Sequence, residues 1–89
     1  MRYALRIAAD ARSDLIALDP WSQEGALDEL EMISDDPSIL PTAGPEGDIV
    51  YSFDRSIGET KCYFTAVLAL NDMGHTLTLL GISIVRSVT

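Results

Sequence analysis

Residues 61–86 read KCYFTAVLALNDMGHTLTLLGISIVR, two apolar runs separated by a short polar segment. The runs at 61–70 and 75–86 are rich in β-branched and aromatic side chains, which favour strands. The NDMG segment at 71–74 has the composition of a tight turn, and Gly74 is free to take a positive φ. Strands joined by so short a turn must pair antiparallel, so this stretch predicts the centre of an antiparallel sheet.

Both runs are apolar at successive positions rather than at alternate ones. This pattern is typical of a central strand that is covered on both faces of its sheet. One face is expected to pack on helices. We expect the other face to be covered by a partner, either a different protein or a second copy of this chain.

Upstream, the segment IVYSFD at 49–54 alternates side chains in the way a strand does. The segment 56–60, which contains Gly58, supplies a turn into the run at 61–70. Before it, residues 37–47 hold three of the four prolines and form the expected loop between the helical and strand halves.

In the N-terminal half, residues 2–8 alternate and predict a half-buried strand. Ala11, Leu15 and Leu18 follow at helical spacing, which predicts a helix at 9–18. Because this helix and the next are joined within a residue or two, the pair should form a hairpin.

A second helix is predicted at 20–34. Asp19 is a favourable N-cap, and Pro20 is tolerated at the first helical position because its missing N–H would have no partner there. The apolar stripe that this helix would bury consists of Ala26, Leu27, Leu30 and Ile33. Asp36-Pro37 ends it, since a residue before proline avoids the α region.

These elements predict an α+β fold of order β-α-α-β-β-β, with a two-helix hairpin packed on an antiparallel sheet that also includes the first strand. The length of 89 residues predicts a single domain over 1–89. A core this small is thin, and oligomerisation would supplement it.

Net charge bears most directly on the choice of partner. Six Lys and Arg against fourteen Asp and Glu give a formal charge of −8. Binding a phosphate backbone requires Lys and Arg to neutralise phosphates, so nucleic acid is a disfavoured partner.

No apolar run reaches the roughly eighteen residues that a membrane span requires. Residues 1–10 lack the apolar segment of a signal peptide. Cys62 is the single cysteine, so an intramolecular disulfide is excluded. We therefore expect a cytoplasmic protein without membrane attachment.

Four carboxylates fall on one face of the second predicted helix, namely Glu24, Asp28, Glu31 and Asp35. The favoured interpretation is a solvated face. A surface for a basic partner and a Mg²⁺ or Ca²⁺ site are the alternatives, although such metal sites usually draw ligands from more than one element.

His75, the single histidine, begins a strand after a turn, and nothing in the sequence marks a nucleophile or carboxylate beside it. Cys62 is expected to be a small buried apolar residue. The chain has no Gly-rich phosphate loop, no metal-ligand spacing of Cys or His, and no Gly-x-Ser-x-Gly motif. We predict no cofactor and no metal, and catalysis of these kinds is disfavoured.

Three segments resemble the RelE/ParE toxin superfamily, and together they span most of the chain. They are RYALRIAADARSDLIAL at 2–18, LDELEMISDDP at 27–37 and LTLLGISIVR at 77–86. The resemblance implies the same order of elements in the fold. It also implies a toxin–antitoxin type protein with a protein partner.

Members of this superfamily that cleave mRNA on the ribosome have a basic sheet surface and usually an arginine in the penultimate strand. Arg86 matches the arginine that ends the last strand. The penultimate strand has Tyr63, Phe64 and Thr65 at the corresponding place, and no Tyr or His follows Arg86. The resemblance therefore implies a degenerate, acidic member. The weak catalytic candidates that remain are Arg55, Lys61, Tyr63, His75 and Arg86.

The sequence leaves several functions open. The favoured hypothesis is a non-catalytic or degenerate RelE/ParE-like protein that binds an antitoxin-like partner or itself as a homodimer. The alternative is a ribosome-dependent mRNA endonuclease with an unusually acidic surface. A gyrase-directed toxin without nuclease chemistry, and an unrelated α+β domain with the same order of elements, are the remaining hypotheses.

Overall fold

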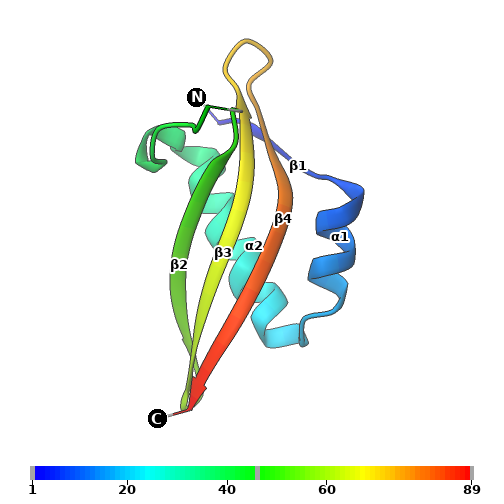
Figure 1. The fold of residues 1–89 in the computed structure, drawn as a ribbon, viewed down its shortest axis with the longest axis vertical. Coiled ribbons are helices and arrows are strands. Elements are labelled where there is room, and N and C mark those ends of the chain that lie inside the picture. The colour runs from blue at the N-terminus through cyan, green and yellow to red at the C-terminus, as the bar shows by residue number, and fades with distance from the viewer. Residues whose placement is uncertain (1, 46, 89) are drawn as a thin grey trace.

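The computed structural model describes residues 2–45 and 47–88, the last of these by its backbone alone. The fold consists of two helices, one 3₁₀ turn and a four-stranded sheet, joined by short connections (Figure 1). The elements are β1 (Ala4–Ile7), α1 (Ala9–Ile16), α2 (Pro20–Asp35), η1 (Pro37–Ile39), β2 (Ile49–Ile57), β3 (Thr60–Asn71) and β4 (Thr76–Val88). The predicted α+β fold, with its order of helices and strands, is confirmed.

The strands are arranged in the order β1-β4-β3-β2. β2 pairs with β3, and β3 with β4, in antiparallel fashion as predicted. β1 joins the same sheet but runs parallel to β4, with Leu5 opposite Leu77. The expectation of an antiparallel sheet is therefore corrected to a mixed one.

The course of the chain explains the parallel pair. α1 continues in the direction of β1, and α2 returns along the sheet, so β2 begins at the end where β1 began (Figure 1). Two tight turns then reverse the chain twice. β4 consequently runs in the direction of β1.

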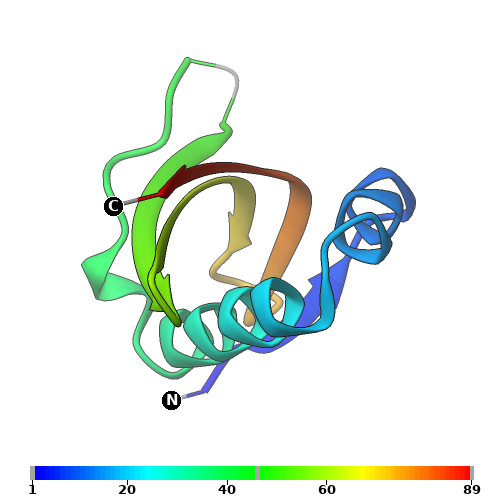
Figure 2. The same cartoon turned by 90° about the horizontal axis from the view of Figure 1, so that it is seen from below.

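The sheet curves around α2, which lies against its concave face, while α1 lies beyond the far edge of β4 (Figure 2). α2 begins as predicted, with the Asp19 carboxylate accepting the backbone N–H of Ser22 at 3.1 Å and Pro20 in the first turn. The core contains Leu30 and Ile33 of α2 against Phe64 and Leu68 of β3, all of them fully buried. Cys62 is also buried, as expected.

A β-bulge in β4 sets which side chains of its second half face α2. Val67 pairs with Gly81 and Leu68 with Leu79, so Leu80 has no partner in β3. One extra residue reverses the alternation of side chains from that point on. Leu77 and Leu79 face α2 before the bulge, and Ile82 faces it after the bulge.

The turn between β3 and β4 differs from the prediction in one respect. The positive φ belongs to His75, at 51°, and not to Gly74. Gly74 instead approaches Asn71, whose side-chain oxygen accepts the Gly74 N–H at 2.9 Å. A Cβ on Gly74 would lie 3.1 Å from the Asn71 amide nitrogen, so the close approach is the reason for glycine here.

No other described part of the chain covers the convex face of the sheet, and its coverage by a partner stays a prediction. Tyr63, Thr65, Ser83 and Val85 point away from α2 and are exposed. The apolar character of the central strands on this side is therefore not explained by a second layer within the chain.

α1 protects the part of β4 that the short β1 leaves unpaired. The Asp14 carboxylate accepts the backbone N–H of Ile82 at 3.2 Å. Ala11 and Leu15 of the same helix are buried beside it. The Asp14 side chain thus accepts a backbone N–H of β4 that a neighbouring strand would otherwise accept.

We expect Asp14→Ala to lower the free energy of unfolding by about 1–2 kcal/mol, because the partly buried Ile82 N–H loses its acceptor. Urea unfolding followed by circular dichroism measures the change. Asp28→Ala, on the exposed face of α2, is the matched control and should stay within about 0.5 kcal/mol of the parent. Equal effects of the two substitutions would contradict the role assigned to Asp14.

Candidate functional site

The five candidate residues lie in three separate places. Arg55 and Arg86 lie on either side of Cys62 in the register of the sheet. Since neighbouring strands are about 4.8 Å apart, the two arginine backbones are about 10 Å apart in one row on the concave face. Lys61 and Tyr63 occupy the convex face. His75 lies at the other end of β4 from Arg86, a distance of roughly 30–35 Å along the strand.

Arg86 is held at the N-terminus of α2. Its guanidinium donates to the Asp19 carboxylate, with which it forms an ion pair, and approaches the Ser22 hydroxyl at 3.5 Å. The Ser22 hydroxyl also donates to Asp19 at 2.7 Å. These bonds from Ser22, followed by the charge of Arg86, hold the pKa of Asp19 below its ordinary value. The helix cap and the arginine therefore share one carboxylate.

Arg55 is held two turns beyond Ser22 along α2. Its guanidinium donates to Glu29 Oε1 at 3.2 Å, and the Tyr51 hydroxyl donates to Glu29 Oε2 at 2.9 Å. Glu29 is buried by these contacts. Burial, and then the bond to Glu29, raise the pKa of Tyr51 above its usual value. Each oxygen of the Glu29 carboxylate therefore has a partner in β2.

Sequence reasoning missed Glu29, although its spacing carried a signal. The exposed acidic face consists of Glu24, Asp28, Glu31 and Asp35, as expected for a solvated stripe. Glu29 stands outside that set. It is three residues after Ala26 and four before Ile33, which places it at the margin of the apolar stripe. A carboxylate at such a position requires a partner from another element.

Lys61 and Tyr63 face away from the two arginines. Lys61 Nζ lies 3.2 Å from the Asp54 carboxylate and 5.8 Å from the centre of the Tyr63 ring. The hydrogen bond and charge of Asp54 raise the pKa of Lys61. Because the sheet separates these residues from Arg55 and Arg86, the four cannot act on one phosphate.

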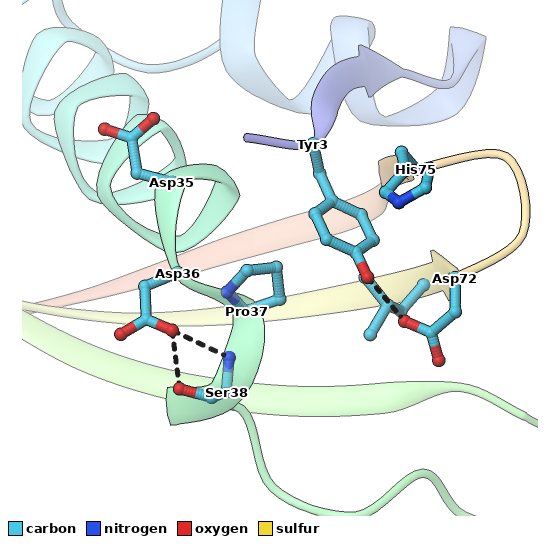
Figure 3. Close-up of a pocket in the computed structure, with 8 residues that line it drawn as sticks. Tyr3, Asp35, Asp36, Pro37, Ser38, Asp72 and His75 are labelled. Carbon is cyan, nitrogen blue, oxygen red and sulfur yellow. Dashed lines mark hydrogen bonds between the residues drawn. The ribbon is translucent and has the colours of Figure 1, made fainter. Parts of the chain in front are cut away.

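His75 belongs to a third place, an open pocket of about 410 Å³ at the turn end of the sheet (Figure 3). Its ring centre lies 5.3 Å from that of Tyr3, whose hydroxyl donates to Asp72 at 2.8 Å. That hydrogen bond is the main cause of the raised pKa of Tyr3. Asp35 and Asp36 also line the pocket. Three carboxylates make this pocket unsuitable for a phosphate group.

Metal chemistry finds no support in residues 2–45 and 47–88, where no group of three His, Cys, Asp or Glu side chains is placed to hold an ion. Within the same residues, neither helix combines the length and apolarity needed to cross a bilayer.

What the geometry does provide is a concave face on which two arginines meet two carboxylates, one at the N-cap of α2 and one within the helix. The positive charges are thereby balanced locally.

This fold, two helices on a curved four-stranded mixed sheet, has clear counterparts among solved structures. No family model and no curated protein sequence matches the chain. A chain of the RelBE2 toxin–antitoxin complex from Mycobacterium tuberculosis aligns over 93% of this chain and 91% of its own length, with a TM-score of 0.70 and 18% identity.

Two E. coli structures are similar to the same degree. A chain of the intact RelBE toxin–antitoxin complex aligns over 91% of this chain and 94% of its own length, with a TM-score of 0.70 and 17% identity. The toxin RelE, as a double arginine-to-alanine mutant in the free state, aligns over 93% of this chain and 83% of its own length, with a TM-score of 0.72 and 14% identity. The chain therefore has the RelE/ParE-like fold that the sequence resemblance implied.

Removing the carboxylate of Glu29 should destabilise the fold. We expect Glu29→Ala to lower the free energy of unfolding by about 1–2 kcal/mol, because Arg55 and the Tyr51 hydroxyl lose a shared acceptor. Chemical denaturation provides the measurement. Glu31→Ala, two residues away on the solvated face, should change stability by less than about 0.5 kcal/mol. A negligible effect at position 29 would show that the contact does not stabilise the folded state.

The lowered pKa of Asp19 predicts a specific pH dependence. A carboxylate whose pKa is lower in the folded state than its unfolded value of about 3.9 stabilises the fold above that pH. The contribution is lost as pH falls through the lower folded-state pKa. Asp19→Asn keeps a good N-cap but has no charge for Arg86. The stability difference between parent and variant should therefore be largest near pH 6 and shrink towards pH 2, as measured by urea unfolding across that range. A difference that does not change with pH would contradict the ion pair.

Proposed function

We propose that this protein is a RelE/ParE-like protein of toxin–antitoxin type that acts in the cytoplasm by binding another protein and has no ribonuclease activity. The observation that supports the proposal is the pairing of the concave arginines. Arg86 is bound to Asp19, and Arg55 is bound to Glu29. Asp19 caps the N-terminus of α2, and Glu29 lies within the helix.

Cleavage of a phosphodiester requires positive donors that are free to stabilise the charge developing on the phosphate. In this protein each concave arginine already donates to a carboxylate, and a phosphate would have to displace it. The displaced Asp19 and Glu29 would then stand beside the phosphate as like charges. The formal charge of −8 adds a long-range repulsion against RNA.

Protein binding has independent support from exposed apolar side chains. Trp21 and Met32 of α2, Ile39 and Val50 are all more than 45% exposed. Two of the similar solved structures are toxin–antitoxin complexes, which makes an antitoxin-like partner or a second copy the natural occupant of such a surface.

One observation favours the alternative, a ribosome-dependent mRNA endonuclease. Arg55 and Arg86 do share the concave face, and Arg86 occupies the place that the superfamily resemblance assigned to an active-site arginine. The two functions make opposite predictions for a single pair of assays.

We expect the purified chain to leave mRNA intact on programmed ribosomes, and its expression at high level to leave bacterial growth unimpaired. Primer extension on the mRNA and growth curves measure the two outcomes. Growth inhibition or mRNA cleavage that Arg86→Ala abolishes, and that the matched Arg12→Ala on the exposed face of α1 does not, would overturn the proposal and establish the endonuclease.

A further inference from the structure

β2 is an outer strand of the sheet, and its free edge has the features of a pairing surface. The turn into β3 has two residues, and Gly58 takes a φ of 63° at the first of them, as in a type II′ hairpin. In such a hairpin the flanking residues Ile57 and Thr60 bond to each other, and the pattern alternates from there. The backbone groups that face away from β3 are therefore those of residues 50, 52, 54 and 56.

The two edges of the sheet differ in how they are protected. At the β1 edge the strand is only four residues long, and the Asp14 carboxylate occupies the next free position on β4. β2 is nine residues long and keeps a regular register with β3 along its whole length. Its sequence contains no proline and no lysine, the residues that commonly block an edge.

Apolar side chains surround this edge. Tyr51, Phe53 and Ile57 are only half-buried, whereas Phe64, the partner of Phe53 in β3, is 1% exposed. On α2, the flank facing β2 is identified by Gly25, which lies beside the Arg55 side chain, and by Glu29.

The two large exposed apolar residues of α2 lie on that same flank. Trp21 is four residues before Gly25, and Met32 is three after Glu29, so helical periodicity places both beside the β2 edge. Trp21 is 69% exposed and Met32 48%. Asp28, seven residues after Trp21 and four before Met32, is exposed on the same flank.

We propose that β2 pairs antiparallel with β2 of a second copy of this chain, about a two-fold axis at Phe53, which joins the two sheets into one. This register places Ser52 of one copy opposite Asp54 of the other, and Val50 opposite Ser56. All four residues whose backbone groups face outward are then bonded. The proposal rests on the proposed function in that it names the protein partner.

The side chains support this register over its neighbour. On the concave side it places Phe53 against Phe53 and Tyr51 opposite Arg55, so aromatic surface that is half-buried in one chain is covered by the other. A slip of the axis to Asp54 would place two like carboxylates directly opposite each other, which is destabilising.

Charge determines how the pairing should respond to salt. Two chains of −8 repel at long range, while the charges at the edge itself are paired within each chain, Asp54 with Lys61 and Arg55 with Glu29. Salt screens the repulsion but leaves backbone hydrogen bonds and apolar contacts intact. The self-pairing should therefore tighten as salt rises, whereas the binding of a basic partner would weaken.

Light scattering on a size column, over a range of protein and salt concentrations, tests the inference on the full chain. We expect a dimer whose dissociation constant falls between 50 mM and 500 mM salt. Ser52→Asp places a carboxylate directly opposite Asp54 of the other copy, and this like-charge pair should weaken the dimer at least about tenfold. Ser83→Asp is the matched control, because Ser83 lies in the same row of the convex face, two strands away, and the substitution makes the same change in charge.

Cross-linking tests the register. A hydrogen-bonded antiparallel pair has Cα atoms about 5.5 Å apart, within the range that a disulfide spans. Under mild oxidation, an equimolar mixture of Ser52→Cys and Asp54→Cys chains should form a covalent dimer that neither variant forms alone.

A monomer at all concentrations, or equal weakening by Ser52→Asp and Ser83→Asp, would overturn the inference. Cross-linking of Asp54→Cys with itself would overturn the register. A monomer that fails to cleave mRNA would leave the proposed function standing with a different partner. A chain that cleaves mRNA would refute the proposed function whatever its oligomeric state.

Discussion

One unpaired residue, Leu80, determines how β4 meets the rest of the molecule. Before it, Leu77 and Leu79 face α2, and the bulge passes that role to Ile82 in the second half of the strand. Without the extra residue, Gly81, Ser83 and Val85 would face the helix, and Ile82 would be lost from the core. Arg86 would then point to the convex face, away from Asp19. The burial of Ile82 and the position of Arg86 on the concave face therefore both depend on the bulge at Leu80.

On the concave face, the positive charges of the sheet are balanced by carboxylates of the same chain. The arginines remain in one row across β2, β3 and β4, as the register of Arg55, Cys62 and Arg86 requires. The helix beneath them supplies Asp19 at its N-cap and Glu29 at its margin. These carboxylates serve the stability of the chain by satisfying buried or capping groups. The same carboxylates also balance the charge of the guanidinium groups that an anion would otherwise meet.

The two edges of the sheet follow from the order of the elements. β1 leads directly into α1, which places Asp14 beside the remaining backbone of β4. No described element pairs with the outer edge of β2, because the chain enters that strand from the connection after η1 and leaves it through a tight turn. An edge that is long, regular and flanked by exposed apolar side chains is a surface suited to another strand.

Local pattern in the sequence determined both helices, the cap at Asp19, the four strands and the antiparallel hairpins, because each depends on spacing and turn chemistry within a few residues. It also determined the burial of Cys62 and the exposure of the acidic stripe. Only the tertiary structure decided the parallel pairing of β1 with β4, the open convex face and the positive φ at His75. The same holds for the separation of His75 from Arg86 and the engagement of Arg55 by Glu29. The contact of Arg55 with Glu29 and the pairing of β1 with β4 join residues 26 and 72 positions apart, and no local preference of the chain encodes which of them meet.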